Sequence, residues 1–307
     1  MESTQRREKM QTTTKESQSG IALKDIVFAT DFSPAADNAL SYAGALAQRF
    51  NAALHVVNAV EPANYSLPPE TWHLADRARD VQTKKIRAFL QTSFPDIQSE
   101  VEIWEGPVSQ VLTSAIDRDS ADLIVVGTHG RTGAGKLLLG SSAEEILRNA
   151  PCPVLTIGPH AQPDPERAFD EILYATDFSP ASLSGARYAI ALAREYGAKL
   201  TLLHVVEGRK TDELVDESDL VESSGRLLRN LVPQGVLREE PRCEVKLGTP
   251  AEKILEVARH LHAGLIVLGA RRASGVPGAA THLPIATVHK VIADAPCPVL
   301  TVRHVQS

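Results

Sequence analysis

Ala29-Thr-Asp-Phe-Ser-Pro-Ala35 recurs as Ala175-Thr-Asp-Phe-Ser-Pro-Ala181, and this repetition decides the fold. Two further stretches recur in the same order: Leu123-Ile-Val-Val-Gly127 as Leu265-Ile-Val-Leu-Gly269, and Ala150-Pro-Cys-Pro-Val-Leu-Thr156 as Ala295-Pro-Cys-Pro-Val-Leu-Thr301. The copies lie 142 to 146 residues apart, which is the length of a domain and not the period of a solenoid. The sequence therefore predicts a duplicated domain.

The length of the chain agrees with two domains, because 307 residues can form two separate cores. We expect a disordered polar tail over residues 1–20, a first domain over 21–158, a Pro-rich linker over 159–168 and a second domain over 169–304.

Composition and charge exclude several classes of partner. The net charge of -6 and the pI near 5.9 give no basic footprint, which argues against nucleic acid as a partner. No apolar stretch approaches the ~18 residues of a membrane span, and residues 1–20 lack the apolar segment of a secretory signal. The three widely spaced cysteines favour a reducing cytoplasm without a structural metal, and we expect them to be packing groups.

Apolar runs alternate with helical periodicity in both copies. Expected strands are 25–30, 53–59, 99–104, 123–126 and 152–157, then 171–176, 199–205, 242–247, 265–268 and 297–302. Expected helices are 34–50, 70–92, 108–117 and one from 141, then 180–196, 213–231, 250–262 and 286–293. This pattern predicts an α/β fold of two tandem Rossmann-like domains, each a five-stranded parallel sheet with helices on both faces.

Two strand ends carry unusual residues, Thr30-Asp31 after the first strand and Gly127 onward after the fourth. If the strand order reverses between them, the two loops face each other across one crevice at which such sheets bind ligands. The fifth strand begins with Pro151 and Pro153, which places it at a sheet edge. Because the second copy repeats these prolines, we expect the two fifth strands to cover one another.

The segment Gly127-Thr-His-Gly-Arg-Thr-Gly-Ala-Gly-Lys-Leu-Leu-Leu-Gly-Ser-Ser142 links the fourth strand to a helix. Glycines leave backbone N–H groups uncovered, and a helix N-terminus favours an anion, so this segment is suited to a phosphate chain. It fails as a Walker A loop because Leu137 stands where Ser or Thr should bind magnesium, and it fails the dinucleotide pattern at Leu138.

Gly127-x2-Gly130-x9-Gly140-Ser141, preceded by Ala29-Thr-Asp31, resembles the nucleotide-binding pattern of the universal stress protein family, and the two copies together resemble a tandem member. The resemblance implies ATP binding, with Mg2+, dimer-like pairing through the fifth strands, and a cytoplasmic role in stress survival. It implies that Asp31 and the backbone around Ala29, Thr30 and Val56 contact adenine and ribose. Val126 and Gly127 would lie beside the ribose, and Gly130, Arg131, Gly140, Ser141 and Ser142 would hold the phosphates.

The second copy departs from this pattern. Gly269 and Asp177 remain, but Arg272 stands at the second glycine, and Ile285 and Ala286 stand where Gly140 and Ser141 are expected. We expect its site to be weak or empty.

Several of these residues also fit purely structural roles. Asp31 and Asp177 also fit turn residues that are hydrogen-bonded locally, Ser33 and Ser179 fit helix caps, and His129 fits an exposed loop residue. His55 and His204 fit satisfied, half-buried strand positions better than ligand-binding ones.

The favoured function is a nucleotide-dependent stress-response binding protein, in which bound ATP orders the loop at residues 128–139. No catalytic residue is identified, so we expect slow hydrolysis at most. A slow ATPase or adenylyl-transferring enzyme and a nucleotide-free interaction module stay open as alternatives, and so does the association of two full chains.

Overall fold

The computed structural model describes residues 20–60, 72–128, 141–162, 165, 169–207, 217–270 and 285–303. The chain forms two compact units, one over Leu23–Glu166 and another that contains Arg167–Ser307. We call them the N-terminal and the C-terminal unit.

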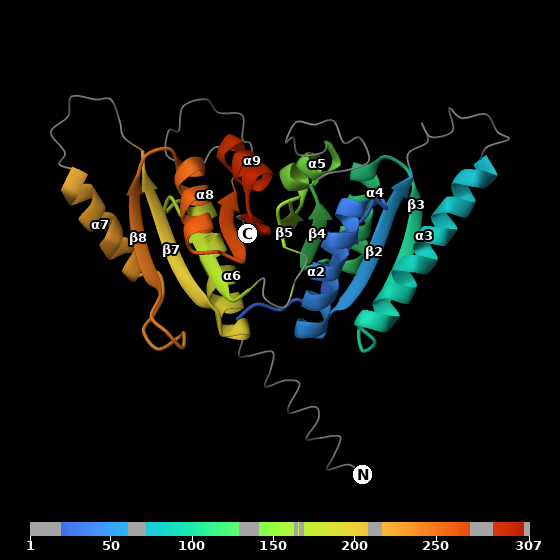
Figure 1. The fold of residues 1–307 in the computed structure, drawn as a ribbon, viewed down its shortest axis with the longest axis horizontal. Coiled ribbons are helices and arrows are strands. Elements are labelled where there is room, and N and C mark those ends of the chain that lie inside the picture. Colours follow the sequence, from blue (N-terminus) through green and yellow to red (C-terminus); the bar gives the residue numbers. More distant parts are fainter. Residues whose placement is uncertain are drawn as a thin grey trace, which may run out of the picture. The chain divides into compact units, whose positions relative to one another are not determined.

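The N-terminal unit alternates strands with helices (Figure 1). Its elements are β1 (Asp25–Ala29), α2 (Pro34–Phe50), β2 (Ala53–Val60), α3 (Trp72–Ser93), β3 (Ser99–Glu105), α4 (Val108–Asp119), β4 (Leu123–Gly127), α5 (Ser141–Asn149) and β5 (Val154–Ile157). The strands are parallel and stand in the order β3-β2-β1-β4-β5.

The C-terminal unit repeats this arrangement (Figure 1). Its elements are β6 (Glu171–Ala175), α6 (Pro180–Tyr196), β7 (Lys199–Val206), α7 (Glu217–Arg229), β8 (Arg242–Leu247), α8 (Pro250–His260), β9 (Leu265–Ala270), α9 (Ile285–Asp294) and β10 (Val299–Arg303). The order β10-β9-β6-β7-β8 is again parallel. The predicted fold class is confirmed as an α/β fold with parallel strands and helices in two tandem copies, but the expected division into two five-stranded sheets is not borne out.

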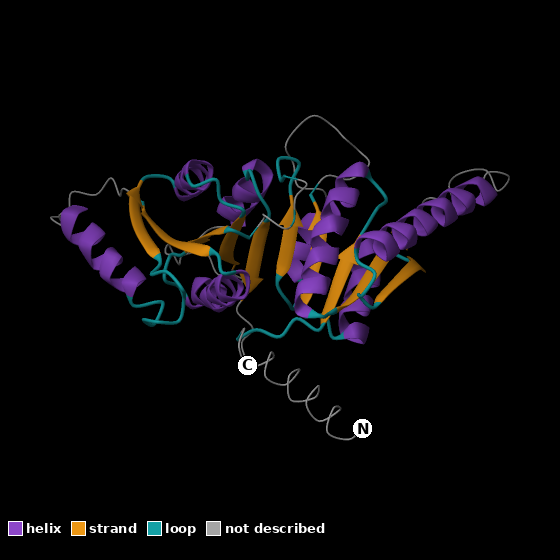
Figure 2. Ribbon diagram, turned by 60° about the horizontal axis from the view of Figure 1, so that its bottom comes forward, coloured by secondary structure: helices purple, strands orange, loops and turns teal. Residues whose placement is uncertain are grey.

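Helices cover both faces of the strands in each unit (Figure 2). From β1 the chain steps outward to β2 and β3 and then returns past β1 to β4. Right-handed crossovers consequently put α2 and α3 on one face and α4 and α5 on the other. The innermost strands read as unbroken apolar runs because both their faces are buried: Leu123, Ile124, Val125 and Val126 are all at most 3% exposed.

The first helix of each unit begins and ends as the sequence predicts. Ser33 accepts a hydrogen bond from the backbone of Ala36, Ser179 does the same for Ser182, and proline occupies the first turn of both helices. Asn51 and Gly197 end these helices in the left-handed conformation.

Most element bounds agree with the predicted ones to within a few residues. Both fifth strands begin two residues later than expected, at Val154 and Val299 and not at the cysteines. A proline precedes each start, and proline has no N–H to donate to a neighbouring strand. None of the helices in the described ranges has the length and apolar character needed to cross a membrane.

Candidate functional site

The strand order of the N-terminal unit reverses at β1, since β2 lies on one side of it and β4 on the other. Ala29, the last residue of β1, pairs with Val126, the residue before the end of β4. The predicted reversal of strand order between the first and fourth strands is therefore present. The segments after Ala29 and after Gly127 leave the sheet at neighbouring positions. Ligands of open α/β sheets bind at such a reversal.

The turn after β1 is held by a short chain of hydrogen bonds. The Thr30 N–H donates to Val57 O at 3.0 Å. Phe32 N–H donates to Thr30 Oγ1 at 3.0 Å, and Ser33 N–H donates to Asp31 Oδ1 at 2.9 Å. Phe32 has a φ of 59°, a left-handed conformation that costs a side-chain-bearing residue about 1–2 kcal/mol. These bonds hold the turn, and with it Asp31, in one shape.

Asn58 on β2 supports this turn from the side. Its Nδ2 donates to Thr30 O at 2.7 Å, and Asn58 and Thr30 are 7% and 8% exposed. The sequence reasoning did not single out Asn58, because a lone amide in an apolar strand carries no motif. The signal that finds it is the repeat offset of 146 residues, which aligns Asn58 with His204.

The other residues predicted to contact adenine or ribose differ in how exposed they are. Ala29 and Gly127 are partly exposed at their strand ends, and Val126 is 2% exposed. Val56 pairs with Phe28 and is fully buried, two residues before the position level with Thr30. Asn58 thus lies beside Thr30 at the end of β1, and the contact through the backbone around Val56 stays a prediction.

The structure describes only the two ends of the segment that is predicted to bind phosphate. Thr128 is 1% exposed, and its N–H donates to Ile157 O at 3.0 Å, which fixes the exit from β4. Helix α5 begins at Ser141, so Ser141 and Ser142 lie in its first turn as predicted. Gly130, Arg131, Gly140 and His129 lie outside the described residues.

The C-terminal unit repeats the turn bond for bond. Phe178 N–H donates to Thr176 Oγ1 at 3.0 Å, Ser179 N–H donates to Asp177 Oδ1 at 2.9 Å, and Phe178 has a φ of 61°. Asp31 and Asp177 therefore both have the local turn role that was weighed against ligand binding. Because the turn is the same in both units, it does not by itself distinguish a binding site from a degenerate one.

Histidine replaces asparagine beside the second turn. His204 Nδ1 lies 2.8 Å from Thr176 O, and since a carbonyl oxygen only accepts, Nδ1 carries the proton. The imidazole also packs on the ring of Phe178, with 4.5 Å between the ring centroids. His204 is therefore a satisfied, half-buried residue, as expected.

A hydroxyl network lies beneath the second turn. Tyr174 O–H donates to Ser182 O at 2.7 Å, and Thr176 Oγ1 lies 2.9 Å from Ser182 Oγ. Burial is the main cause that raises the pKa of Tyr174 to about 12. The N-terminal unit has Phe28 and Ala36 at the positions of Tyr174 and Ser182, so it lacks these hydroxyls.

Gly269 has a packing role in the C-terminal unit. A Cβ at this position would lie 2.1 Å from Ser182 Cα and 2.4 Å from Ala181 O, because the first turn of α6 packs directly against the end of β9. The retained glycine is thus explained by helix packing and does not indicate a ligand.

His55 lies away from the candidate site, at the amino-terminal side of the sheet. Its Nε2 is 3.0 Å from Asp25 Oδ1, and its Nδ1 is 3.6 Å from Asp119 Oδ2. In the C-terminal unit, Thr201 donates to Glu171 at the equivalent positions. The Leu-His-Val triplets around His55 and His204 look alike in the sequence, but the structure places them three residues apart in register.

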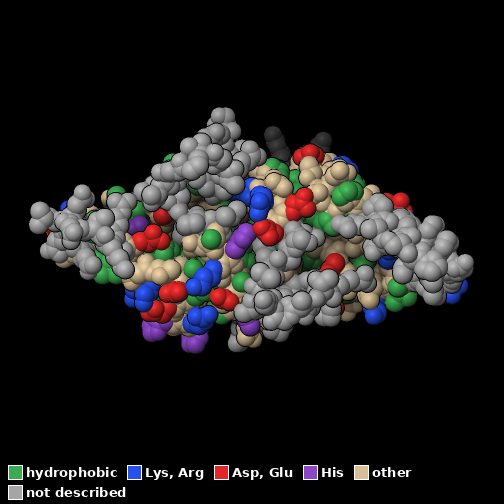
Figure 3. Space-filling model, turned by 90° about the horizontal axis from the view of Figure 1, so that it is seen from above, with side chains coloured by type: hydrophobic (Ala, Val, Ile, Leu, Met, Phe, Trp, Pro, Cys, Tyr) green, Lys and Arg blue, Asp and Glu red, His purple; other side chains and the backbone are tan. Residues whose placement is uncertain are grey.

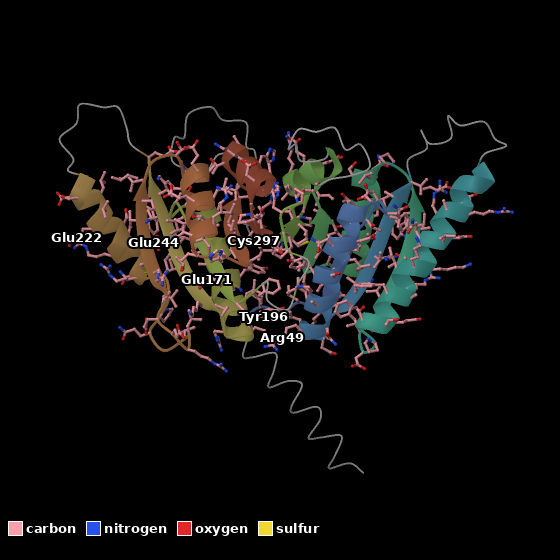
Figure 4. All side chains as sticks on the ribbon, in the orientation of Figure 1. Arg49, Glu171, Tyr196, Glu222, Glu244 and Cys297 are labelled. Carbon is pink, nitrogen blue, oxygen red and sulfur yellow. The ribbon has the colours of Figure 1, made fainter. Side chains whose placement is uncertain are left out.

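The described residues offer no sign of metal or thiol chemistry. Within these ranges no group of three or more His, Cys, Asp and Glu side chains is placed to hold a metal ion. Cys297, labelled in Figure 4, is 4% exposed, and burial raises the pKa of its thiol to about 12. Among the side chains coloured in Figure 3, acidic and basic groups are interspersed without a broad patch of one sign.

Comparison with known proteins gives a consistent result. A family model described as the universal stress protein family matches residues 22–158 and again 168–303. A universal stress protein of Mycolicibacterium smegmatis is 26% identical over 294 residues, which cover 91% of this chain and 96% of that protein. A single-domain relative from Thermus aquaticus is 34% identical over 134 residues, 44% of this chain and 98% of the relative. A crystal structure of a universal stress protein from Archaeoglobus fulgidus DSM 4304 covers 94% of this chain and 97% of its own, with a TM-score of 0.67 at 21% identity, which shows likeness of fold.

Proposed function

The chain belongs to the universal stress protein family, and we propose that its N-terminal unit binds ATP, with Mg2+, as a nucleotide-dependent binding protein of the cytoplasmic stress response. The observation that carries the proposal is the reversal of strand order between β1 and β4. It sets the Asp31 turn beside the end of β4, where the glycine-rich segment begins.

The turn after β1 and the N-terminus of α5 suit the two ends of an adenine nucleotide. Asp31 offers a carboxylate acceptor on a hydrogen-bonded turn, and Ala29 and Gly127 leave the backbone at the strand ends little covered by side chains. On the other side, the N-terminus of α5 supplies N–H groups and a positive dipole end for phosphate oxygens. Gly130, Gly140 and the two serines would complete this cradle, and Arg131 would add charge.

The C-terminal unit would serve as the weak or empty partner. Arg272 adds a bulky side chain at the second glycine position, and Pro284 removes an N–H shortly before α9. The repeated Pro-Cys-Pro motif supports the further proposal that the two units pair through their fifth strands. No group in a position to activate water is apparent among the described residues of either turn, so binding and not turnover would be the output.

The test is a calorimetric titration of ATP with magnesium into the full chain and into its Gly130→Arg variant, which copies Arg272. We expect saturable binding without turnover to the wild type and a loss of at least about 10-fold in affinity in the variant. The matched control is Arg272→Gly, which should leave the measured affinity unchanged.

Other outcomes lead to other functions. Steady ATP turnover would favour an ATPase or adenylyl-transferring enzyme, and no binding to the wild type would favour a nucleotide-free interaction module. An unchanged affinity in Gly130→Arg would contradict the assignment of that loop.

A further inference from the structure

We infer that the protein associates head to tail with a second copy of itself, through two surfaces that occupy equivalent positions in the two units. One surface, the α3–β3 face, is formed by α3 and β3 of the N-terminal unit. The other, the α7–β8 face, is formed by α7 and β8 of the C-terminal unit (Figure 1). Each helix packs on its strand, and each strand is the last in its unit. The inference is independent of nucleotide binding.

Exposed apolar side chains gather on these two faces. Seven large hydrophobic side chains in the described ranges are exposed, by 36% to 51%, and six of them lie here. They are Val81, Phe89 and Ile103 on the α3–β3 face and Leu220, Leu227 and Leu247 on the α7–β8 face. The seventh, Leu183, lies on α6. Exposed apolar residues that gather in this way mark a surface for association with another protein.

The two edge strands offer backbone groups for pairing. Gly106 N–H, just after β3, donates to Val60 O of β2 at 2.9 Å. Since backbone groups alternate in direction along a strand, the odd-numbered residues of β3 point theirs away from the sheet. Arg87 Nη2 reaches one of these groups, Val101 O, at 3.2 Å. The equivalent bond after β8 leaves its odd-numbered groups pointing outward too, so both edges hold donors and acceptors for a strand of another chain.

The two helices carry opposite net charge. Five basic and two acidic residues give α3 a net charge of +3, although the whole chain has -6, whereas two basic and three acidic residues give α7 a net charge of -1. Arg77, Val81 and Lys84 are exposed and share one stripe of α3 at helical spacing. On α7, Asp219 and Glu222 are exposed beside the leucines. Helix against helix, a basic surface therefore meets an acidic one.

The charges of the two strands are reversed relative to those of the helices. β3 carries Glu100, Glu102 and Glu105 and no basic residue, whereas β8 carries Arg242 and Lys246 against one acid. Opposite charges stabilise neighbouring strands, and like charges directly opposite one another destabilise them. Two α3–β3 faces would therefore repel at both the helix and the strand, while an α3–β3 face and an α7–β8 face attract at both. Charge thus selects the head-to-tail contact.

Such a contact joins two different faces, so each copy in a pair still offers one unfilled face. Association of this heterologous kind continues beyond the dimer unless it closes into a ring. A self-complementary contact would stop at two copies. The two kinds of contact are therefore distinguishable by which blocked variants can associate with each other.

The experiment is sedimentation of the full-length protein over a series of concentrations. We expect the wild type to associate as concentration rises, and less so at high salt because the attraction is partly electrostatic. Val81→Glu blocks the α3–β3 face, and Leu220→Ser combined with Leu227→Ser blocks the α7–β8 face. Each variant alone should associate at least about 10-fold more weakly than the wild type. The matched control is Leu183→Ser, which removes the exposed leucine outside both faces and should change nothing.

Mixing the two blocked variants is the decisive step. Each supplies the face that the other lacks, so the mixture should form pairs that contain one copy of each variant and grow no further. If Val81→Glu does not fold by circular dichroism, Lys84→Glu, which reverses an exposed charge on the same stripe, takes its place.

Several results would overturn the inference. A wild type that stays monomeric at every concentration contradicts it, and so does wild-type association that neither blocked variant weakens. Full association of one blocked variant by itself would show that a face pairs with its own kind. A mixture that does not associate would show that the two faces do not bind each other.

Discussion

The turn after β1 and the turn after β6 follow the same backbone path, but the side chains beneath them differ. Under the first lie Phe28 and Ala36, and under the second lie Tyr174 and Ser182, whose hydroxyl and carbonyl groups bind one another. The turn after β1 is supported by apolar packing, and the turn after β6 is supported by a buried polar network. The comparison teaches that a shared turn can be retained for folding, so the proposed difference in ligand binding has to come from the surrounding residues.

The largest effect is expected at Gly269. Gly269→Ala would place its Cβ 2.1 Å from Ser182 Cα, so α6 must shift, and we expect a loss of about 3 kcal/mol in the unfolding free energy of the C-terminal unit. Urea unfolding, monitored by circular dichroism, measures this loss of unfolding free energy. Both tryptophans, Trp72 and Trp104, lie in the N-terminal unit and report that unit separately.

Gly225→Ala in α7 is the control for Gly269→Ala. The one atom near its added Cβ is the Nη1 of Arg229 at 3.5 Å, an ordinary contact. Alanine is the better helix former by about 0.5–1 kcal/mol, so this variant should be neutral or more stable. Equal losses in the two variants would contradict the tight packing of α6 on β9.

Alkaline pH should weaken the C-terminal unit through Tyr174. Its pKa is raised by burial from 10.0 to about 12. Below pH 10 the phenol is neutral in both states and its contribution to stability is complete. Between pH 10 and 12 the unfolded chain ionises first, so stability falls by an amount on the order of 2 kcal/mol.

The measurement for this effect is urea unfolding as a function of pH for the wild type and for Tyr174→Phe. The phenylalanine variant lacks the ionising group, so its stability should fall less steeply over the same pH range. Parallel curves for the two proteins would show that Tyr174 is not the group responsible.

The hydroxyl network should behave as one unit. Tyr174→Phe and Ser182→Ala, which copy Phe28 and Ala36, should each cost about 1–1.5 kcal/mol in unfolding free energy because each removes a buried hydrogen bond. The double variant should cost less than the sum of the two single losses, by at least about 0.5 kcal/mol. Strict additivity in urea unfolding would contradict the coupling.

The smallest stability effect, but the sharpest contrast between units, is expected at the two aspartates. Asp31→Ala and Asp177→Ala each remove one turn hydrogen bond, to Ser33 and to Ser179, at a cost of about 1 kcal/mol in unfolding free energy. ATP affinity should fall only in Asp31→Ala. An equal fall in both variants would mean that both units bind.

The sequence predicts the elements well because the repeat supplies each of them twice. Apolar runs such as 123–126 have little freedom to be anything but buried strands, and Ser-Pro pairs fix where α2 and α6 begin. The neighbouring positions of the segments after β1 and β4 follow once the strand order is known.

The register of β2 could not be read from local similarity. The Leu-His-Val triplet around His55 resembles the one around His204, but the two triplets do not occupy equivalent positions in their strands. The equal 17-residue lengths of α2 and α6 instead align Asn58 with His204. Side-chain networks such as Tyr174 with Ser182 also escape the sequence, since they depend on which helix residue meets which strand residue.

The central claim is that this tandem chain has one competent nucleotide site. Equilibrium dialysis of the full-length protein against radiolabelled ATP with magnesium measures the number of sites directly. We expect saturation at one ATP per chain, reduced sharply by Gly130→Arg. Saturation at two equivalent sites, or no saturable binding, would contradict it.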